Sequence, residues 1–317
     1  MKIAVVGPGA IGLLLTGLLS RSKEDIWVLD KDGERAARLK KNGIRIEGLT
    51  NLKLSTLQVT TELKDVQDAD FWIICVKSYD TKNVVKKISD FVSVNSFVLS
   101  LQNGVGNAEL LSETFGARRV LLGVTHMGAT LLSEGVLRHA GEGETIVGKL
   151  DGSLGAELKD LREVFQKSKI AIRFSKDVTG VVWSKLIINV GINALSAITR
   201  LKNGRLVQFE GTRRILREAV TEASKVAKRK RIKLIYDDVL AKAESVCEAT
   251  SDNVSSMLQD ILNRKKTEID FLNGAIVRQG ESLGIKTPVN ELLVDLIKTI
   301  ESSYHQEVVR VCQDDKG

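Results

Sequence analysis

An apolar run that turns directly into a glycine triplet constrains this chain more than any other feature. A strand is expected at residues 3–6, and Gly7, Gly9 and Gly12 follow it at the spacing G-x-G-x-x-G. In such a turn the first glycine permits the bend, the second leaves room for a pyrophosphate, and the third lets the next helix pack on the sheet. Unpaired N–H groups at the helix N-terminus favour an anion there. Because a second strand is expected at 26–29, the sequence predicts a dinucleotide-binding turn made by Gly7, Pro8, Gly9, Ala10, Ile11 and Gly12.

Size and composition are those of a globular protein with room for two domains. The chain has 317 residues, 43% hydrophobic and 27% charged, and its two prolines argue against long irregular segments. The expected first strand leaves no place for a cationic and apolar leader, and no apolar run reaches the roughly 18 residues that span a bilayer. We therefore expect a cytoplasmic protein without a membrane partner.

The net charge of +7 raises the question of an acidic partner. The densest basic run, residues 225–233, lies in an expected helix and has no interleaved aromatic residues for base stacking. A solvated helix face explains it better than nucleic-acid binding. Neither a disulfide framework nor a metal site is expected, because Cys75, Cys247 and Cys312 share no ligand spacing.

The hydrophobic pattern changes its period near residue 175. Before that point short apolar runs alternate with amphipathic segments, which is typical of a parallel sheet with crossover helices. After it helical periodicity dominates. The sequence therefore predicts an α/β doubly wound domain at 1–175 and an all-α domain at 176–317. The expected strands are 3–6, 26–29, 71–76, 97–101 and 120–125, with 43–47, 52–59, 135–140 and 145–148 extending the same sheet, and the expected helices are 178–199, 207–229, 236–250, 255–283 and 288–311.

Two loops after expected strands carry chemically useful side chains. Lys77 follows the strand at 71–76, and Asn103 follows the strand at 97–101. A nicotinamide ring bound at the glycine turn would lie near such strand ends. A cation and a carboxamide placed there can contact a ribose, a phosphate or a substrate carbonyl. Ordinary loop capping stays open, since Asn-Gly is a common turn pair.

Polar side chains also recur along two expected helices. Lys185, Asn189 and Asn193 stand four residues apart in an otherwise apolar segment, so they face water or line an internal site, and we favour the site. Lys185 is then a candidate proton donor. The second helix carries polar residues four apart, which are either part of a site or part of an exposed face with salt bridges. These residues are Ser256, Asp260, Arg264 and Glu268. No metal-ligand spacing is shared by His126, His139 and His305. A structural role is expected for His126, which lies near the end of an expected strand.

Taken together, these motifs resemble the ketopantoate reductase family, within the wider 6-phosphogluconate-dehydrogenase-like group. The likeness covers essentially the whole chain and implies a Rossmann-type N-terminal domain followed by an all-helical substrate domain. The motifs are G-x-G-A-x-G at 7–12, V-K-S at 76–78, Q-N-G-V-G at 102–106, W-S-K-L-x-x-N-x-x-x-N at 183–193, N-G at 203–204, and S-S-M-x-Q-D with T-E-I-D-x-L-N-G at 255–274.

The resemblance implies a function: NAD(P)H-dependent reduction of 2-dehydropantoate to pantoate, for pantothenate and coenzyme A biosynthesis. It implies that Lys185 donates the proton and that Glu268 orients this lysine and the ribose side of the cofactor. A reductase of another small 2-keto or 3-hydroxy acid, or a nucleotide-sensing protein without chemistry, stays an alternative. The resemblance implies substrate contacts from Asn103, Asn189, Asn193, Asn203 and Ser256, and cofactor contacts from Lys77, Asn103 and Ala129.

The chain departs from the family where the adenosine ribose would bind. The family commonly has an arginine just past the second strand, whereas this chain has Asp30 followed by Lys31. A carboxylate suits the free 2′-hydroxyl of NADH, and Lys31 could pair with the 2′-phosphate of NADPH. The resemblance favours NADPH, and NADH stays open because of Asp30. The sequence does not fix the oligomeric state, and a homodimer stays open.

Overall fold

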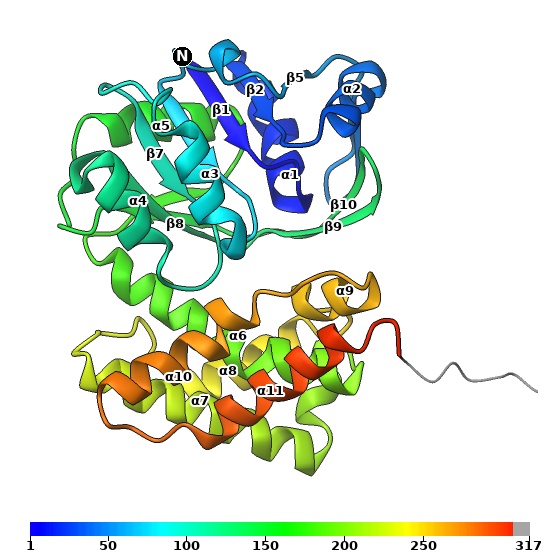
Figure 1. Cartoon of the computed structure of the whole chain (residues 1–317), viewed down its shortest axis with the longest axis vertical. Helices are drawn as coiled ribbons and strands as arrows, with labels where there is room; N and C mark the ends of the chain where they lie inside the picture. Colours follow the sequence, from blue (N-terminus) through cyan, green and yellow to red (C-terminus); the bar gives the residue numbers. More distant parts are fainter. Residues whose placement is uncertain (307–317) are drawn as a thin grey trace, which may run out of the picture. The chain divides into compact units, whose positions relative to one another are not determined.

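The computed structural model describes residues 1–306 and divides the chain into two compact units (Figure 1). One unit comprises residues 1–186 and 231–237, and the other comprises 187–230 and the chain from 238 onward. The division falls inside helix α6 (Val178–Thr199). The domain boundary expected at residue 175 stays a prediction. Cys312 and the end of the helix expected at 288–311 lie outside the described residues.

The main sheet of the first unit has the strand order of a doubly wound dinucleotide-binding fold. Six parallel strands follow the order 3-2-1-4-5-6, which reverses between the first strand and its neighbour. Two further strands extend one edge of the sheet. The first pairs antiparallel with the sixth strand, and the second pairs in parallel with the first. From edge to edge the strands are β5 (Gln58–Thr60), β2 (Asp25–Leu29), β1 (Lys2–Val6), β6 (Phe71–Ile74), β7 (Phe97–Ser100), β8 (Val120–Thr125), β11 (Thr145–Gly148) and β12 (Ile172–Phe174).

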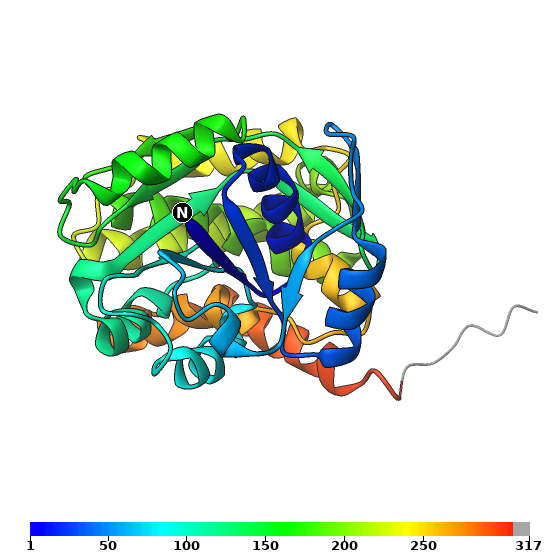
Figure 2. The ribbon, with the colours of Figure 1, turned by 90° about the horizontal axis from the view of Figure 1, so that it is seen from above.

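Helices cover both faces of this sheet, which explains why its strands are continuously apolar. Figure 2 shows helices on both sides of the sheet. On one face Val5 packs in a cluster with Leu15 and Phe165, and on the other Val6 packs in a cluster with Val85 and Leu111. The flanking helices are α1 (Ala10–Leu19) with α5 (Glu157–Lys167), and α3 (Thr81–Ile88) with α4 (Asn107–Phe115); α2 (Gly33–Asn42) follows β2.

The expectation that every short strand extends the main sheet was wrong. Segments 43–47 and 135–140 instead belong to a separate four-stranded sheet, whose strand β9 the pattern did not reveal. The strand expected at 52–59 is two strands, of which the first lies in this small sheet and the second in the main sheet. The small sheet packs against α1, which explains its separation from the main sheet. The Ile46 side chain fills the space beside Gly17 of α1, where an added Cβ would lie 2.3 Å from Ile46 Cδ1. The small sheet runs β4 (Leu52–Leu54), β3 (Ile44–Gly48), β10 (Val136–Gly141) and β9 (Gly128–Ser133).

Acid should weaken the small sheet through His139 on β10. The ring is buried, with Nδ1 3.0 Å from Thr50 Oγ1, and burial lowers the pKa of His139 below its ordinary 6.5. The unfolded chain therefore binds the proton more readily, so stability present above pH 6.5 falls as the pH decreases below it. Between about pH 7.5 and pH 5, which lie on either side of the ordinary histidine pKa, we expect the melting temperature of His139→Gln to fall less than that of the wild type. Equal losses in calorimetry would contradict this role.

The second unit is helical throughout its described residues. It begins with the second half of α6, and the other helices follow in chain order. They are η5 (Asn203–Val207), α7 (Glu210–Arg229), α8 (Val239–Ala249), α9 (Ser256–Leu262), η6 (Ile269–Phe271), α10 (Asn273–Ser282) and α11 (Pro288–Ser302).

A single helix over residues 255–283 was a wrong prediction. The helix α9 ends at Leu262, and Arg264 adopts the left-handed conformation with φ +50°. Backbone N–H groups past the end satisfy its last carbonyls, as in the 2.9 Å bond from Lys265 N to Asp260 O. Glu268 therefore lies in the connection before η6 and not one turn farther along the same helix as Arg264.

Within the described residues one helix, α6, is long and apolar enough to span a membrane by length and composition alone. However, 78% of its most apolar window is buried inside the protein. This helix is part of the core, and its apolar character reflects packing.

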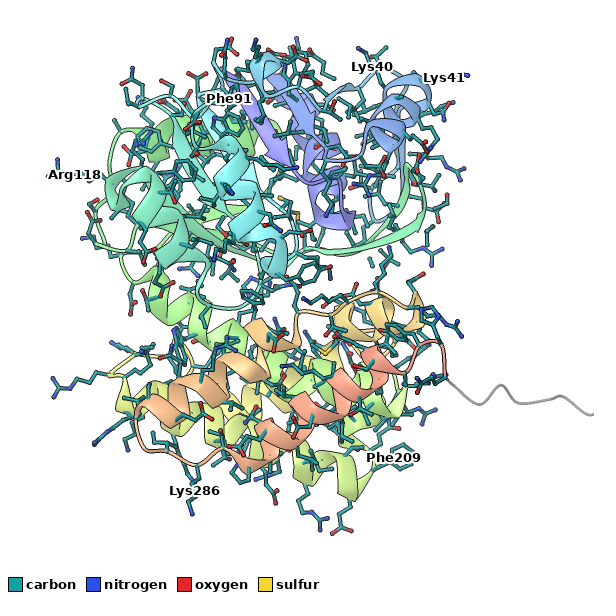
Figure 3. The ribbon with its side chains drawn as sticks, in the orientation of Figure 1. Lys40, Lys41, Phe91, Arg118, Phe209 and Lys286 are labelled. Atoms are coloured by element: carbon teal, nitrogen blue, oxygen red, sulfur yellow. The ribbon has the colours of Figure 1, made fainter. Side chains whose placement is uncertain are left out.

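Basic side chains lie on several separate elements. Lys40 and Lys41 extend outward from the end of α2, Arg118 from η4 (Ala117–Arg119), and Lys286 from the connection between α10 and α11 (Figure 3). The basic run at 225–233 continues beyond the end of α7 into an irregular segment, and Lys225, Lys228 and Arg229 within it are exposed. The positive charge is therefore distributed over many elements.

Candidate functional site

The glycine turn after β1 has the geometry that a pyrophosphate requires. Gly7 has φ +100°, and a Cβ there would lie 2.6 Å from Val76 Cγ1. A Cβ on Gly12 would lie 2.1 Å from the carbonyl oxygen of Gly7. By contrast, nothing lies within 4 Å of a Cβ built on Gly9, the residue before the first turn of α1. The turn thus leaves open space next to a helix N-terminus, so its residues fit a dinucleotide.

Predicted residues of the first unit lie together along the edge of the main sheet at which its parallel strands end. Asp30 follows β2, the half-buried Lys77 follows β6, and the half-buried Asn103 follows β7. These are carboxyl ends of parallel strands, like the end of β1 that carries the glycine turn. Ala129 is half-buried on β9, opposite His139 of the small sheet.

Lys185 of α6 also reaches this edge. Its Nζ donates a 2.8 Å hydrogen bond to the carbonyl oxygen of Thr125, the last residue of β8. Thr125 is itself fixed, because its Oγ1 accepts hydrogen bonds from Thr145 Oγ1 and the N–H of Met127, both at 3.2 Å. The ammonium group therefore has a fixed acceptor within the unit that holds the glycine turn.

The first turns of α6 are anchored next to Lys185. The carboxylate of Asp177 accepts a 2.9 Å hydrogen bond from the N–H of Gly180. The fully buried hydroxyl of Ser184 donates to the Gly180 carbonyl and accepts from the N–H of Ile235. The bond from Ile235 holds the segment at 231–237 against the part of α6 that carries the lysine.

In the second unit, Asn189 is half-buried on α6 and Asn193 is buried. One turn beyond Asn193, Ser196 Oγ lies 2.5 Å from Ser255 Oγ, which joins the start of α9 to α6. Ser255 is also the N-cap of α9, accepting a 3.1 Å bond from the N–H of Leu258. Ser256, the predicted substrate contact, is the next residue and is exposed.

Asn203 and Glu268 are buried on connections within the same unit. Asn203 Nδ2 donates a 2.9 Å bond to Thr250 Oγ1, while among the described residues its buried Oδ1 has no hydrogen-bond partner. Glu268 precedes η6. A few residues later Asn273 Nδ2 donates to the carbonyl oxygen of Val190 at 3.1 Å, which ties this connection to α6 one residue beyond Asn189.

Arg35 is a residue that the sequence analysis missed. Its Nε donates a 2.7 Å bond to Asp30 Oδ2, and its Nη2 pairs with Oδ1. Hydrogen bonding to Asp30 raises the pKa of Arg35 above its usual range. The Asp30 side chain is 0% exposed, whereas Arg35 is 33% exposed. A basic residue in the turn after the N-cap Asp32 of α2 is the signal that could have revealed it.

The fold and this edge define the class: a two-domain, dinucleotide-dependent oxidoreductase. Two family models match the chain. The model described as "Ketopantoate reductase PanE/ApbA" matches residues 3–152, and the one described as "Ketopantoate reductase PanE/ApbA C terminal" matches residues 177–301. The chain belongs to the ketopantoate reductase PanE/ApbA family, and the predicted family and fold class are confirmed.

Similar proteins cover nearly the whole chain. A 2-dehydropantoate 2-reductase of Halobacterium salinarum is 35% identical over 301 residues, 94% of this chain and 98% of its own length. The crystal structure of a PanE/ApbA family ketopantoate reductase from Ralstonia eutropha JMP134 has a TM-score of 0.88 and 33% identity, covering 96% of this chain and 99% of that one. A ternary structure of D-mandelate dehydrogenase with NADH and anilino(oxo)acetate has a TM-score of 0.89 and 27% identity, with the same coverage.

Proposed function

We propose that the chain reduces 2-dehydropantoate to pantoate with a reduced nicotinamide nucleotide, in the cytoplasm and as a step of pantothenate and coenzyme A biosynthesis. The observation that carries this proposal is the Lys185 ammonium, held at 2.8 Å from the Thr125 carbonyl at the strand edge that also carries the glycine turn. Family membership supports the choice of substrate. Besides the reduced nucleotide, the partner that this chemistry requires is a small keto acid.

Each proposed residue has a distinct task in the reaction. Bound NAD(P)H would supply the hydride that reduces the ketone carbon. Lys185 stabilises the negative charge that develops on the ketone oxygen and then donates a proton to it. The Thr125 carbonyl orients the ammonium group. We assign the substrate hydroxyl and carboxylate to Asn103, Asn189, Asn193, Asn203 and Ser256, the orienting carboxylate to Glu268, and the cofactor to residues 7–12, Lys77, Asn103 and Ala129.

For the cofactor we propose NADPH. Asp30 alone would repel a 2′-phosphate, but its carboxylate is covered by Arg35, so the ribose side meets a guanidinium group instead. Lys31 adds an exposed cation, which is held 3.0 Å from Asp80 Oδ2. Guanidinium groups bind phosphate in a bidentate geometry. The buried Asp30 then acts as the support for Arg35 and does not contact the ribose.

Arg35→Ala should reverse part of this preference. The variant removes a phosphate partner and uncovers the Asp30 carboxylate, which repels a phosphate and accepts a hydrogen bond from a free hydroxyl. We expect the ratio of kcat/KM for NADPH to that for NADH to fall by at least about tenfold. Arg38→Ala is the matched control, because Arg38 lies farther along α2 and pairs with Glu134. An unchanged ratio in Arg35→Ala would exclude this contact.

A second candidate substrate class comes from the likeness to D-mandelate dehydrogenase. Pocket shape selects the side chain of the keto acid. Steady-state rates with 2-dehydropantoate and with an aryl 2-keto acid, followed by the loss of cofactor absorbance, distinguish the two. We expect the larger kcat/KM with 2-dehydropantoate, and a larger value with the aryl acid would reject our choice of substrate.

A further inference from the structure

The loops that carry Lys77 and Asn103 are joined by a buried polar network. Ser78, Thr81 and Asn107 are each at most 4% exposed. Ser78 Oγ donates a 2.6 Å bond to the main-chain carbonyl oxygen of Asn103. Asn107 Nδ2 donates to that same oxygen at 3.2 Å and to Ser78 Oγ at 3.0 Å. Two loops that follow different strands therefore share one set of bonds.

The rest of the network fixes the orientation of the Asn107 amide. Thr81 Oγ1 lies 2.8 Å from Asn107 Oδ1 and 2.8 Å from the Ser78 carbonyl oxygen, so its single proton is shared between acceptors. Gln102 Nε2 donates to Thr81 Oγ1 at 2.7 Å and to the Val76 carbonyl oxygen at 2.9 Å. Rotating the Asn107 amide by half a turn would place its oxygen against the Asn103 carbonyl, which cannot donate.

We propose that Asn107 is a positioning residue for the reaction, acting through the backbone of Asn103 and, by way of Ser78, on the loop of Lys77. This inference rests on the proposed function, in which Asn103 contacts substrate and cofactor. A carbonyl that accepts two buried hydrogen bonds is fixed in place, and the Cα from which the Asn103 side chain extends is held with it. The network thus fixes the point from which the Asn103 carboxamide extends, while its own Ser78, Thr81 and Asn107 side chains are buried.

The test is the substitution Asn107→Asp, which keeps the shape of the side chain but replaces its N–H donors with an oxygen. That oxygen would face the Asn103 carbonyl and displace it. We expect kcat/KM for 2-dehydropantoate to fall about a hundredfold, the loss that a misplacement of about 1 Å can cause. Asn95→Asp, at an exposed position of the same unit, is the charge-matched control and should retain wild-type activity. Rates are measured at a temperature at which circular dichroism shows each variant to be folded.

A double-mutant cycle separates positioning from a general structural role. If Asn107 acts through Asn103, adding Asn107→Asp to Asn103→Ala should cost little beyond the loss from Asn103→Ala alone. If Asn107→Asp does not fold, Thr81→Val takes its place, because it removes the shared hydroxyl with little change in shape, and Thr81→Ser should restore activity.

Three results would overturn the inference. Wild-type kcat/KM in Asn107→Asp would do so and leave the proposed function intact. Equal losses from Asn107→Asp with and without the Asn103 side chain would show that it acts elsewhere. Full activity in Asn103→Ala would remove the role of Asn103 from the proposed function, and the inference with it, while the role of Lys185 is tested separately.

Discussion

Replacing Lys185 with alanine is expected to lower kcat for 2-dehydropantoate reduction by at least about a hundredfold, the usual scale for loss of a general acid. The variant loses both the proton donor and the positive charge that stabilises the developing oxyanion. The affinity for NADPH should stay nearly unchanged, because the glycine turn lies on β1 and α1 while the lysine contacts the end of β8. Steady-state rates and cofactor fluorescence titration measure the two effects separately.

Two controls make the result specific to this ammonium group. Lys176→Ala removes an exposed lysine shortly before α6 and should leave kcat unchanged. Lys185→Arg keeps a positive charge but offers a far weaker acid, so it should retain part of the charge stabilisation and lose the proton transfer. Wild-type kcat in Lys185→Ala would reject the assigned role.

The architecture of the first unit could be predicted because its constraints are local. A strand that is buried on both faces must be apolar at every position, as Phe71–Ile74 is, and the glycine turn at 7–12 marks the switch from strand to helix. The small sheet could not be predicted, since β3 pairs in parallel with β10, from which it is separated by nearly ninety residues. Short alternating segments do not reveal which sheet they join.

The helical spacing of polar residues led to a wrong prediction where a connection between two helices kept the same spacing. Polar residues at 256, 260, 264 and 268 keep the spacing of a helix face, but the left-handed Arg264 ends the helical path after α9. The contact between Ser196 and Ser255, the N-cap residue of α9, depends on tertiary structure. Spacing alone therefore located the region of Ser256 and Glu268 but not its shape.

The residues of the candidate site also differ in how far the sequence alone could reveal them. That Lys185 has a polar partner was predictable, because a polar residue in an apolar helix is costly without one. Asn107 was not, because its contacts to Ser78 and Thr81 span more than twenty residues of sequence. Arg35 was missed because the interpretation stopped at Asp30 and Lys31, whereas the guanidinium group folds back from the first turns of α2.

The glycine turn gives a second large effect, in which substitutions of Gly12 and Gly9 should act through different causes. A Cβ on Gly12 would lie 2.1 Å from the Gly7 carbonyl oxygen, a backbone atom that cannot rotate away, so Gly12→Ala must open the turn. Overpacking of this kind costs about 1–3 kcal/mol of stability. We expect a lower melting temperature and a loss of NADPH affinity of at least about a hundredfold, roughly 2.7 kcal/mol.

Gly9→Ala should weaken binding without weakening the fold. Gly9 has φ −75° and ψ −176°, which alanine adopts without strain, and its added Cβ would meet no protein atom within 4 Å. The melting temperature of the free protein should therefore equal that of the wild type, whereas the methyl group would occupy space needed by the pyrophosphate and weaken NADPH binding by about tenfold, or 1.4 kcal/mol. Calorimetry and fluorescence titration of both variants test this contrast. Wild-type NADPH affinity in Gly9→Ala would mean that no phosphate approaches this backbone, and the cofactor site would have to lie elsewhere.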